Sequence, residues 1–277
     1  MNELCMIIKD MNTYNTNNES AIVVENYYRY YKTFARTGIV DCHESPVNWI
    51  LPKPGEKGPS LAFNIRLEPE TAEEIIREHI KGIRKRKVPE IWFITPDSTP
   101  DNIISILERN GFKNLSSESN EPEPGMLLSK DDFCPYPTST DGMICRKVQS
   151  KADFRIWIDI VNTALHGWEM IDAKNYYTWV ENGVYDFYLA EIDGTPVSTV
   201  ATIRNGDTAS MEFVSTLNKY RRRKAAITLS TLALDELFAN GVKNVTLSGS
   251  VEAVALYKKL GFHSCFHNIL MKYSISD

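Results

Sequence analysis

The fold of this chain is decided by the stretch MEFVSTLNKYRRRKAA, residues 211–226, together with ALYKKLGF, residues 255–262. The first stretch begins as a β-strand, turns through four cations and continues into an apolar segment that predicts a helix. Cations at the start of a helix oppose its macrodipole by a few tenths to about 1 kcal/mol. We therefore expect an anion to bind at residues 221–224, because a helix start offers free backbone N–H groups.

Length and charge limit the class of protein. The chain has 277 residues, which is enough for two domains of ordinary size, and its apolar fraction of 43% can fill a sizeable core. The net charge of −5 and the pI near 5.7 argue against general nucleic-acid binding, which usually needs a basic domain. RNA binding through Arg221–Arg223 is therefore the weakest interpretation of the basic run.

The cysteines predict no metal site and no disulfide framework. All five are scattered and no Cys-x-x-Cys pair occurs, which indicates reduced thiols in a cytoplasmic protein. His263 and His267 flank Cys265, but on a strand they are only neighbours on one face, so we expect no metal there. The N-terminus lacks the pattern of a signal peptide, and no apolar run is long enough to span a membrane.

The order strand, helix, strand, helix, Gly-Phe occurs twice along the chain. The glycines of the two Gly-Phe pairs, at 111 and 261, each lie 40 residues after the predicted start of a long helix, at Thr71 and Arg221. This spacing predicts an internal duplication of one α/β unit. In place of RRRK at 221–224 the first copy has TAEE at 71–74, whose carboxylates would repel an anionic ligand.

The composition also predicts where the two copies separate. GMLL at 125–128 is predicted to be the strand that closes the first copy, and the Pro- and Ser/Thr-rich segment 131–142 is the best domain boundary. Near the N-terminus, residues 25–37 predict a helix with an aromatic core face at positions 27, 30, 31 and 34.

Both quoted stretches resemble the cofactor-binding core of the GNAT superfamily of N-acyltransferases. The phosphate loop of that family reads Gln/Arg-x-x-Gly-x-Gly/Ala directly after a strand, and Arg221, Lys224 and Ala226 hold the matching positions. The second family signature is a helix with a Leu-Tyr pair that closes on Gly-Phe, matched here by Leu256-Tyr257 and Gly261-Phe262. The resemblance implies an α/β fold with mixed sheets in two tandem GNAT-like domains. It places a degenerate domain at residues 1–135 and an acetyltransferase domain at 142–277.

The resemblance further implies that acetyl-CoA is the cosubstrate and that the second domain binds it. Backbone groups at Val214 and Thr216 correspond to those that hold the pantetheine arm in the family. Ser250 replaces an asparagine that faces the cofactor in many members, although it is also placed to cap a helix. The residues that correspond to the pyrophosphate site are Arg221, Arg222, Arg223, Lys224, Ala225 and Ala226.

Two side chains are candidates for the chemistry of acyl transfer. Tyr257 matches the general acid of the family and would protonate a leaving thiolate without tuning of its pKa; its alternative role is packing. Glu212 stands where several members place a base. Strand alternation puts residues 210, 212, 214 and 216 on one face, whereas a bulge would reverse the direction of Glu212. His166, Trp168 and Glu169 fall in the loop that lines the acceptor site in the family.

Lys224 is the main departure from the family pattern, because the central loop glycine allows the backbone to approach a phosphate. We expect the lysine to be tolerated, since a residue in a first helical turn needs no positive φ. The predicted function is acetyl-CoA-dependent N-acetyltransfer to a small-molecule or peptide amine, without nucleic-acid or membrane partners. The alternative is a catalytically silent module that binds coenzyme A or serves as an interaction domain, which a blocking Lys224 would favour. Neither the acceptor nor the oligomeric state follows from the sequence.

Overall fold

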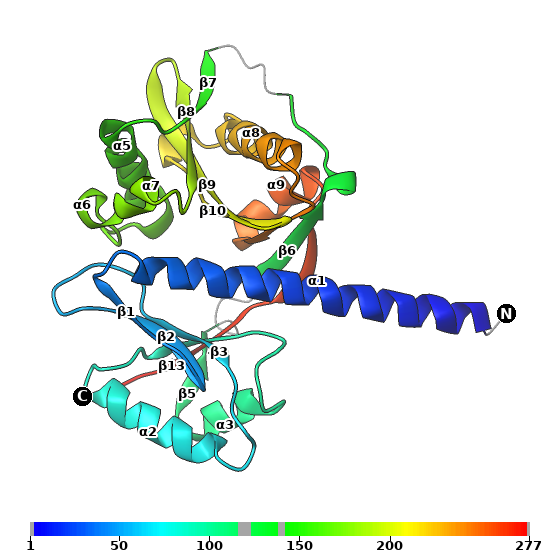
Figure 1. The fold of residues 1–277 in the computed structure, drawn as a ribbon, viewed down its shortest axis with the longest axis vertical. Helices are drawn as coiled ribbons and strands as arrows, with labels where there is room; N and C mark the ends of the chain where they lie inside the picture. The colour runs from blue at the N-terminus through cyan, green and yellow to red at the C-terminus, as the bar shows by residue number, and fades with distance from the viewer. Residues whose placement is uncertain (1–2, 116–122, 138–141, 276–277) are drawn as a thin grey trace.

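The computed structural model describes residues 3–115, 123–137 and 142–275, with side chains described from Asn18 onward. It contains two β-sheets with helices packed against them, and the long helix α1 (Glu3–Ala35) passes between the two domains (Figure 1). The first sheet has the strand order β1-β2-β3-β4-β13-β5, and the second has the order β12-β6-β11-β10-β9-β8-β7. Within these described ranges, no helix is both long and apolar enough to cross a membrane.

The first domain alternates strands and helices after α1. Helix α2 buries one face of apolar residues, and its acidic first turn and basic last turn both match the helix macrodipole. The elements of this part of the chain are β1 (Val40–His43), β2 (Val47–Pro52), β3 (Leu61–Ile65), α2 (Ala72–Arg84), β4 (Ile91–Ile94), α3 (Ile103–Arg109), β5 (Phe112–Asn114) and β6 (Pro124–Ser129).

The second domain repeats this order, with extra helices before its long strands. Helix α8 is apolar on most of its surface and lies in the centre of a buried cluster. The elements are η1 (Lys130–Asp132), β7 (Met143–Lys147), α5 (Lys151–Val161), η2 (Asn162–His166), α6 (Ala173–Tyr176), α7 (Thr178–Glu181), β8 (Asp186–Ile192), β9 (Thr195–Asn205), β10 (Thr208–Thr216), η3 (Asn218–Tyr220), α8 (Ala225–Ala239), β11 (Asn244–Ser248), η4 (Val251–Ala253), α9 (Val254–Lys259), β12 (His263–His267) and β13 (Ile269–Tyr273).

The internal duplication is confirmed in the order of elements and in the local backbone. The sequence β3, α2, β4, α3 corresponds to β10, α8, β11, α9. Asn64 in β3 and Phe213 in β10 adopt φ values of 51° and 52° where the strand pairing shifts register. Gly111 and Gly261, after the last helix of each unit, have φ values of 92° and 102°. Positive φ is uncommon outside glycine, so its recurrence at matching places indicates a shared backbone plan.

The two domains exchange their last strands. Strand β6 pairs with β11 and β12 in the second sheet, whereas β13 pairs with β4 and β5 in the first (Figure 1). The prediction that residues 125–128 close the first sheet is therefore wrong. Both faces of β6 are apolar and buried, Leu127 in the cluster that includes α1 and Met126 and Leu128 in the cluster around α8. An apolar pattern of this kind does not tell which of two sheets receives the strand.

The aromatic face predicted for residues 25–37 is confirmed within α1. Tyr27 and Phe34 are buried, and Tyr30 and Tyr31 are partly buried against the same core cluster. The ring of Tyr30 lies 5.7 Å from that of Phe213 in β10, measured between centroids. A helix at the start of the first domain thus forms part of the core of the second.

Candidate active site

A cleft of about 930 Å³ opens in the second domain between strand β10, the turn before α8, and the start of α9. Most of the residues predicted for the cofactor and for catalysis lie in its walls. The predicted residues that line it are Val214, Thr216, Arg221, Arg222, Lys224, Ala225, Ala226, Ser250 and Tyr257. These residues, predicted from the sequence, therefore surround one cleft.

The cleft begins where two parallel strands separate. Strands β10 and β11 pair only from Thr208↔Asn244 to Ser210↔Thr246. Beyond this point β11 continues against β6, while β10 runs on to Thr216 paired with β9 alone among the described strands. Backbone N–H and C=O groups on the open side of β10 are thus available to a ligand, since a lone strand edge is a template for further hydrogen bonds.

A bulge in β10 separates Glu212 from the residues that line the cleft. The pairing with β9 shifts between Glu212 and Ser215, and Phe213 has a φ of 52°. Val214 consequently packs towards the cluster around α8 and lines the cleft, whereas Phe213 packs in the cluster that includes α1. The expectation that residues 212, 214 and 216 share one face is wrong, because the extra residue of a bulge reverses the alternation after it.

The turn before α8 has a more unusual backbone than expected. The helix begins at Ala225, so the four cations at 221–224 lie in the turn and not in the first helical turn. Arg222 and Lys224 have φ values of 61° and 70°. The prediction that Lys224 needs no positive φ is wrong: this position has the left-handed conformation that a glycine adopts freely. A residue with a Cβ pays roughly 1–2 kcal/mol for it.

Lys224 does not fill the cleft with its side chain. The residue is exposed, and its Nζ lies 5.6 Å from the centre of the Tyr136 ring at the cleft wall. A hydrogen bond with the Tyr136 hydroxyl raises the pKa of the lysine. The ammonium group therefore stays charged beside the cleft, held against an aromatic ring.

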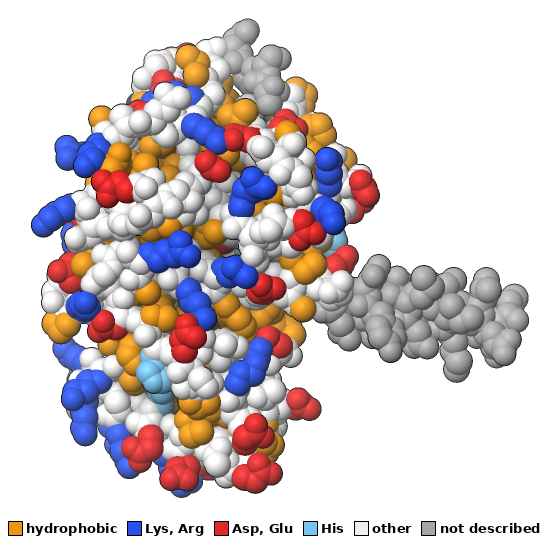
Figure 2. Space-filling model, in the orientation of Figure 1, with side chains coloured by type: hydrophobic (Ala, Val, Ile, Leu, Met, Phe, Trp, Pro, Cys, Tyr) orange, Lys and Arg blue, Asp and Glu red, His pale blue; other side chains and the backbone are white. Residues whose placement is uncertain are grey.

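The neighbouring arginines point in different directions. Arg221 donates from Nε to the Thr216 carbonyl at 3.5 Å, and its Nη1 lies 3.6 Å from Oε2 of Glu252. Arg223 does not line the cleft, and its guanidinium pairs with Asp193 at 3.4 Å in the β8–β9 turn. Elsewhere, on the face drawn in Figure 2, Lys and Arg side chains are interspersed with Asp and Glu.

Tyr257 is buried at the inner wall of the cleft. Its ring packs edge-on against Phe262, with 5.8 Å between centroids. It also lies so close to Gly249 that a Cβ there would stand 3.3 Å from its Cδ2 atom. Burial raises the pKa of Tyr257, and the charges of Glu212 and Glu123 raise it further. The expectation of an unshifted pKa is therefore wrong, and the buried hydroxyl is a weaker acid than that of an ordinary tyrosine.

Glu212 carries a partly buried carboxyl group on the other face of β10. Its Oε1 atom is buried without a hydrogen-bond partner among the described residues, although part of the side chain remains accessible. Burial raises the pKa of Glu212 to about 8, and a hydrogen bond with Ser210 opposes that rise. Its charge in turn raises the pKa values of Tyr30 and Tyr31 on α1, after the burial of those rings. The carboxyl group thus lies near enough to α1 for its charge to act on these two rings.

The other predicted site residues have mixed outcomes. Ser250 precedes η4 and its side chain makes no capping hydrogen bond, so a capping role is wrong. His166 ends the π-helical turn η2, where burial lowers its pKa. Trp168 is 58% exposed, and Glu169 pairs with Lys57 of the first domain. The last three do not line the described cleft, although Ala164 and Leu165 just before them do.

Sequence reasoning missed several residues of the site. Tyr136 and Glu252 line the cleft, and Glu123 lies near enough to Tyr257 for its charge to raise the pKa of that hydroxyl. Tyr136 and Glu123 come from segments beside β6, whose place in the second sheet was not predicted. Glu252 stands two positions after Ser250 in the sequence, but nothing in the sequence indicated that it pairs with Arg221.

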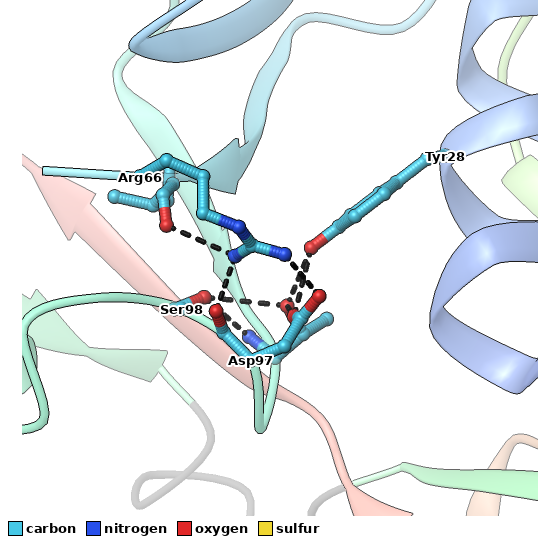
Figure 3. A network of polar contacts seen from close by, with 6 residues as sticks. Tyr28, Arg66, Asp97 and Ser98 are labelled. Carbon is cyan, nitrogen blue, oxygen red and sulfur yellow. Dashed lines mark hydrogen bonds and ion pairs between the residues drawn. The ribbon is translucent and has the colours of Figure 1, made fainter. Parts of the chain in front are cut away.

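The corresponding place in the first domain is closed. After β3, Arg66 bridges Thr99 in parallel, and the backbone N–H of Leu67 donates to the Thr99 carbonyl at 3.3 Å. The Arg66 guanidinium donates to the carboxylate and backbone carbonyl of Asp97 (Figure 3). Tyr28 of α1 donates to the same carboxylate at 3.0 Å. These contacts fill the place in the first domain that corresponds to the open gap between β10 and β11 in the second.

Comparison with known proteins agrees with this geometry. The family described as "Acetyltransferase (GNAT) domain" matches residues 158–273. The matched residues include β10, α8, β11 and α9, the elements around the cleft. No curated protein matches the sequence significantly.

Solved structures show that the fold extends over both domains. A GCN5-related N-acetyltransferase from Kribbella flavida matches with a TM-score of 0.67 at 16% identity, covering 91% of this chain and 96% of that one. A GCN5-related N-acetyltransferase from Sphaerobacter thermophilus has a TM-score of 0.59 at 15% identity, with 84% and 82% covered. A tandem GNAT protein from the clavulanic acid biosynthesis pathway has a TM-score of 0.57 at 13% identity, with 83% and 79% covered. The predicted fold of two tandem GNAT-like domains is thereby confirmed.

Proposed function

We propose that this protein is an acetyl-CoA-dependent N-acetyltransferase, with the cofactor in the cleft of the second domain and a small-molecule or peptide amine as acceptor. The GNAT domain supports acyl transfer in general. The observation that supports the specific proposal most is the separation of β10 from β11 beside a turn of cations. The free backbone groups of β10 can bind the amides of a ligand. The start of the long helix α8 can bind its phosphates.

The cleft suits a ligand of the size and charge of acetyl-CoA. Its volume of about 930 Å³ is large for a binding pocket. The first residues of α8, Ala225 and Ala226, line it beside Arg221, Arg222 and Lys224, so a pyrophosphate would find N–H donors and cations together. When bound, acetyl-CoA would supply an acetyl group activated as a thioester. The open edge of β10 would hold its extended arm.

Tyr257 is the proposed proton donor. Its hydroxyl is protonated at neutral pH, as it would be at the ordinary tyrosine pKa of about 10, and the residue lines the cleft next to the separated strands. From this place it can give a proton to a leaving thiolate, a stronger base than the carboxylates around it. Packing alone would not require a hydroxyl on this ring.

Glu212 is the proposed base, acting from the opposite face of β10 to the cleft. The residue lies two positions beyond the last pair of β10 with β11, so both faces are close to the gap between the strands. With a pKa of about 8, the carboxylate is partly ionised near neutral pH and can accept a proton from an ammonium group. Glu123 places a further carboxyl group near Tyr257, and its negative charge when ionised would favour a cationic amine over a neutral acceptor.

The alternative is a catalytically silent module that binds coenzyme A or serves as an interaction domain. Ion pairing of Arg221 with Glu252 favours it, because a phosphate must compete with that carboxylate. The geometry of Lys224 weighs against it, since the side chain turns towards Tyr136 and leaves the cleft open.

We place the domains at residues 1–135 and 142–277, with their last strands exchanged. We propose a cytoplasmic location from the unpaired cysteines.

The proposal is tested by incubating the full chain with acetyl-CoA and a panel of small amines and Lys-containing peptides, with thiol release and product mass as readouts. Thiol release that depends on an amine, with a mass gain of one acetyl group, is the expected result. Binding of acetyl-CoA without turnover on any amine would favour the silent module. No binding at all would refute both functions.

A further inference from the structure

Three side chains that commonly bind metals meet where α1 passes the edge strand β12. Glu19 comes from α1, and His263 and Cys265 come from β12. One ligand atom from each lies within 4.8 Å of the others, and Oε2 of Glu19 is 3.1 Å from Nε2 of His263. None of them belongs to the cleft described above.

The fold brings these residues together in a way that the sequence spacing does not show. Glu19 and His263 are 244 positions apart in the chain. The pairing of β12 with β6 shifts between Ser264 and Phe266, so Cys265 is the extra residue of a bulge. Bulges redirect side chains at sheet edges, and β12 is the edge strand of the second sheet.

We propose that Glu19, His263 and Cys265 form a Zn²⁺ site, with water as the fourth ligand. Carboxylate, imidazole and thiolate are all zinc ligands, and the soft thiolate disfavours Mg²⁺ and Ca²⁺. In a tetrahedral zinc site, Zn–N and Zn–O distances of about 2.0–2.2 Å and a Zn–S distance of about 2.3 Å place the ligand atoms roughly 3–4 Å apart. The present separations approach that arrangement, so rotation of the side chains is enough to complete it.

The charges and protons of the site balance with a divalent cation. One carboxylate and one thiolate neutralise Zn²⁺, which suits a partly buried place. Binding requires the thiolate form of Cys265, so the thiol proton is released to solvent, and His263 must carry its proton on Nδ1 so that Nε2 can bind the metal.

Such a site would join two parts of the chain that belong to different domains. Helix α1 begins the first domain, and β12 belongs to the second sheet. A metal that binds only the folded protein stabilises it by mass action. The site would thus hold α1 against the second domain without taking part in the proposed acyl transfer.

The experiment uses the full chain freed of metal, with Co²⁺ as a spectroscopic probe and Zn²⁺ as the competitor. We expect a thiolate-to-cobalt charge-transfer band that one equivalent of Zn²⁺ removes. Cys265→Ser should abolish the band, while Cys145→Ser, a control at another partly buried thiol, should retain it. His263→Gln and Glu19→Gln should weaken zinc binding by roughly 10- to 100-fold, at least the effect of losing an outer-shell partner.

Two results would overturn the site: absence of the band in the unmodified chain, or a band that survives in Cys265→Ser. Should Cys265→Ser fail to fold, the partly exposed His263 provides the second test. Zn²⁺ should raise the melting temperature of the unmodified protein and not that of His263→Gln. If Zn²⁺ raises the melting temperature of both proteins by the same amount, the proposed ligands are excluded as well.

Discussion

Replacing Glu212 with Gln should remove a loss of stability at alkaline pH. In the native protein this carboxyl keeps its proton up to about pH 8, whereas its ordinary pKa is 4.5. Between these values the native state binds more protons than the unfolded state, so the free energy of unfolding decreases as pH rises and levels off above pH 8. The part of this interval between pH 6 and about pH 8 spans two pH units. At 1.36 kcal/mol per unit, they correspond to about 2.7 kcal/mol, an upper limit because the side chain is partly accessible to water.

Urea unfolding at pH 6 and pH 9 measures this effect. The Glu212→Gln variant should gain stability relative to the unmodified chain by about 1–3 kcal/mol between the two pH values. Glu74→Gln, which changes an exposed glutamate on α2, is the matched control and should show no such gain. Parallel pH profiles for Glu212→Gln and the unmodified chain would refute the claim that this carboxyl is held protonated by burial.

Three further predictions concern the cleft and the backbone that shapes it. Tyr257→Phe should lower kcat with little change in cofactor affinity, because the ring still packs against Phe262 and only the proton donor is lost; unchanged kcat, with the chemical step shown to be rate-limiting, would assign Tyr257 to packing. Lys224→Gly should leave stability within about 1 kcal/mol, whereas Lys224→Val should cost about 1–3 kcal/mol in thermal or urea unfolding, since a β-branched residue fits a φ of 70° poorly; equal stabilities would contradict the left-handed turn. Gly261→Ala should destabilise the protein by about 1–3 kcal/mol more than Gly241→Ala, because a Cβ at 261 would stand 2.1 Å from the Asp132 carbonyl oxygen while none of the described atoms lies within 4 Å at 241; urea midpoints that are equal for the two variants would exclude that contact.

The fold and the position of the cleft were predictable because they depend on local pattern and spacing. The basic turn between a strand and an apolar helix, and the Leu-Tyr and Gly-Phe pairs, specified the unit that contains Arg221 and Tyr257. The duplication followed from the repeated spacing, and its confirmation extends to the backbone, in the paired conformations of Asn64 and Phe213.

Features that depend on pairing between distant segments were not predictable. An apolar strand such as β6 fits either of two similar sheets, so its exchange with β13 required the three-dimensional structure. A single bulge at Phe213 reversed the direction assigned to Glu212, because strand alternation has a period of two residues. The direction of Arg223 was also missed, since its partner Asp193 lies in a turn 30 positions away.

The claim that the second domain alone binds the cofactor is tested most directly by calorimetric titration of the full chain with acetyl-CoA. One binding site per chain is predicted. Arg221→Ala should weaken binding by about 1–3 kcal/mol, the scale of charge-assisted hydrogen bonds, whereas Arg223→Ala should leave it unchanged because that side chain faces Asp193. Replacing Glu73 and Glu74 with Ala in the first domain should also have no effect. Two sites per chain, or an Arg221→Ala variant with unaltered affinity, would contradict the account.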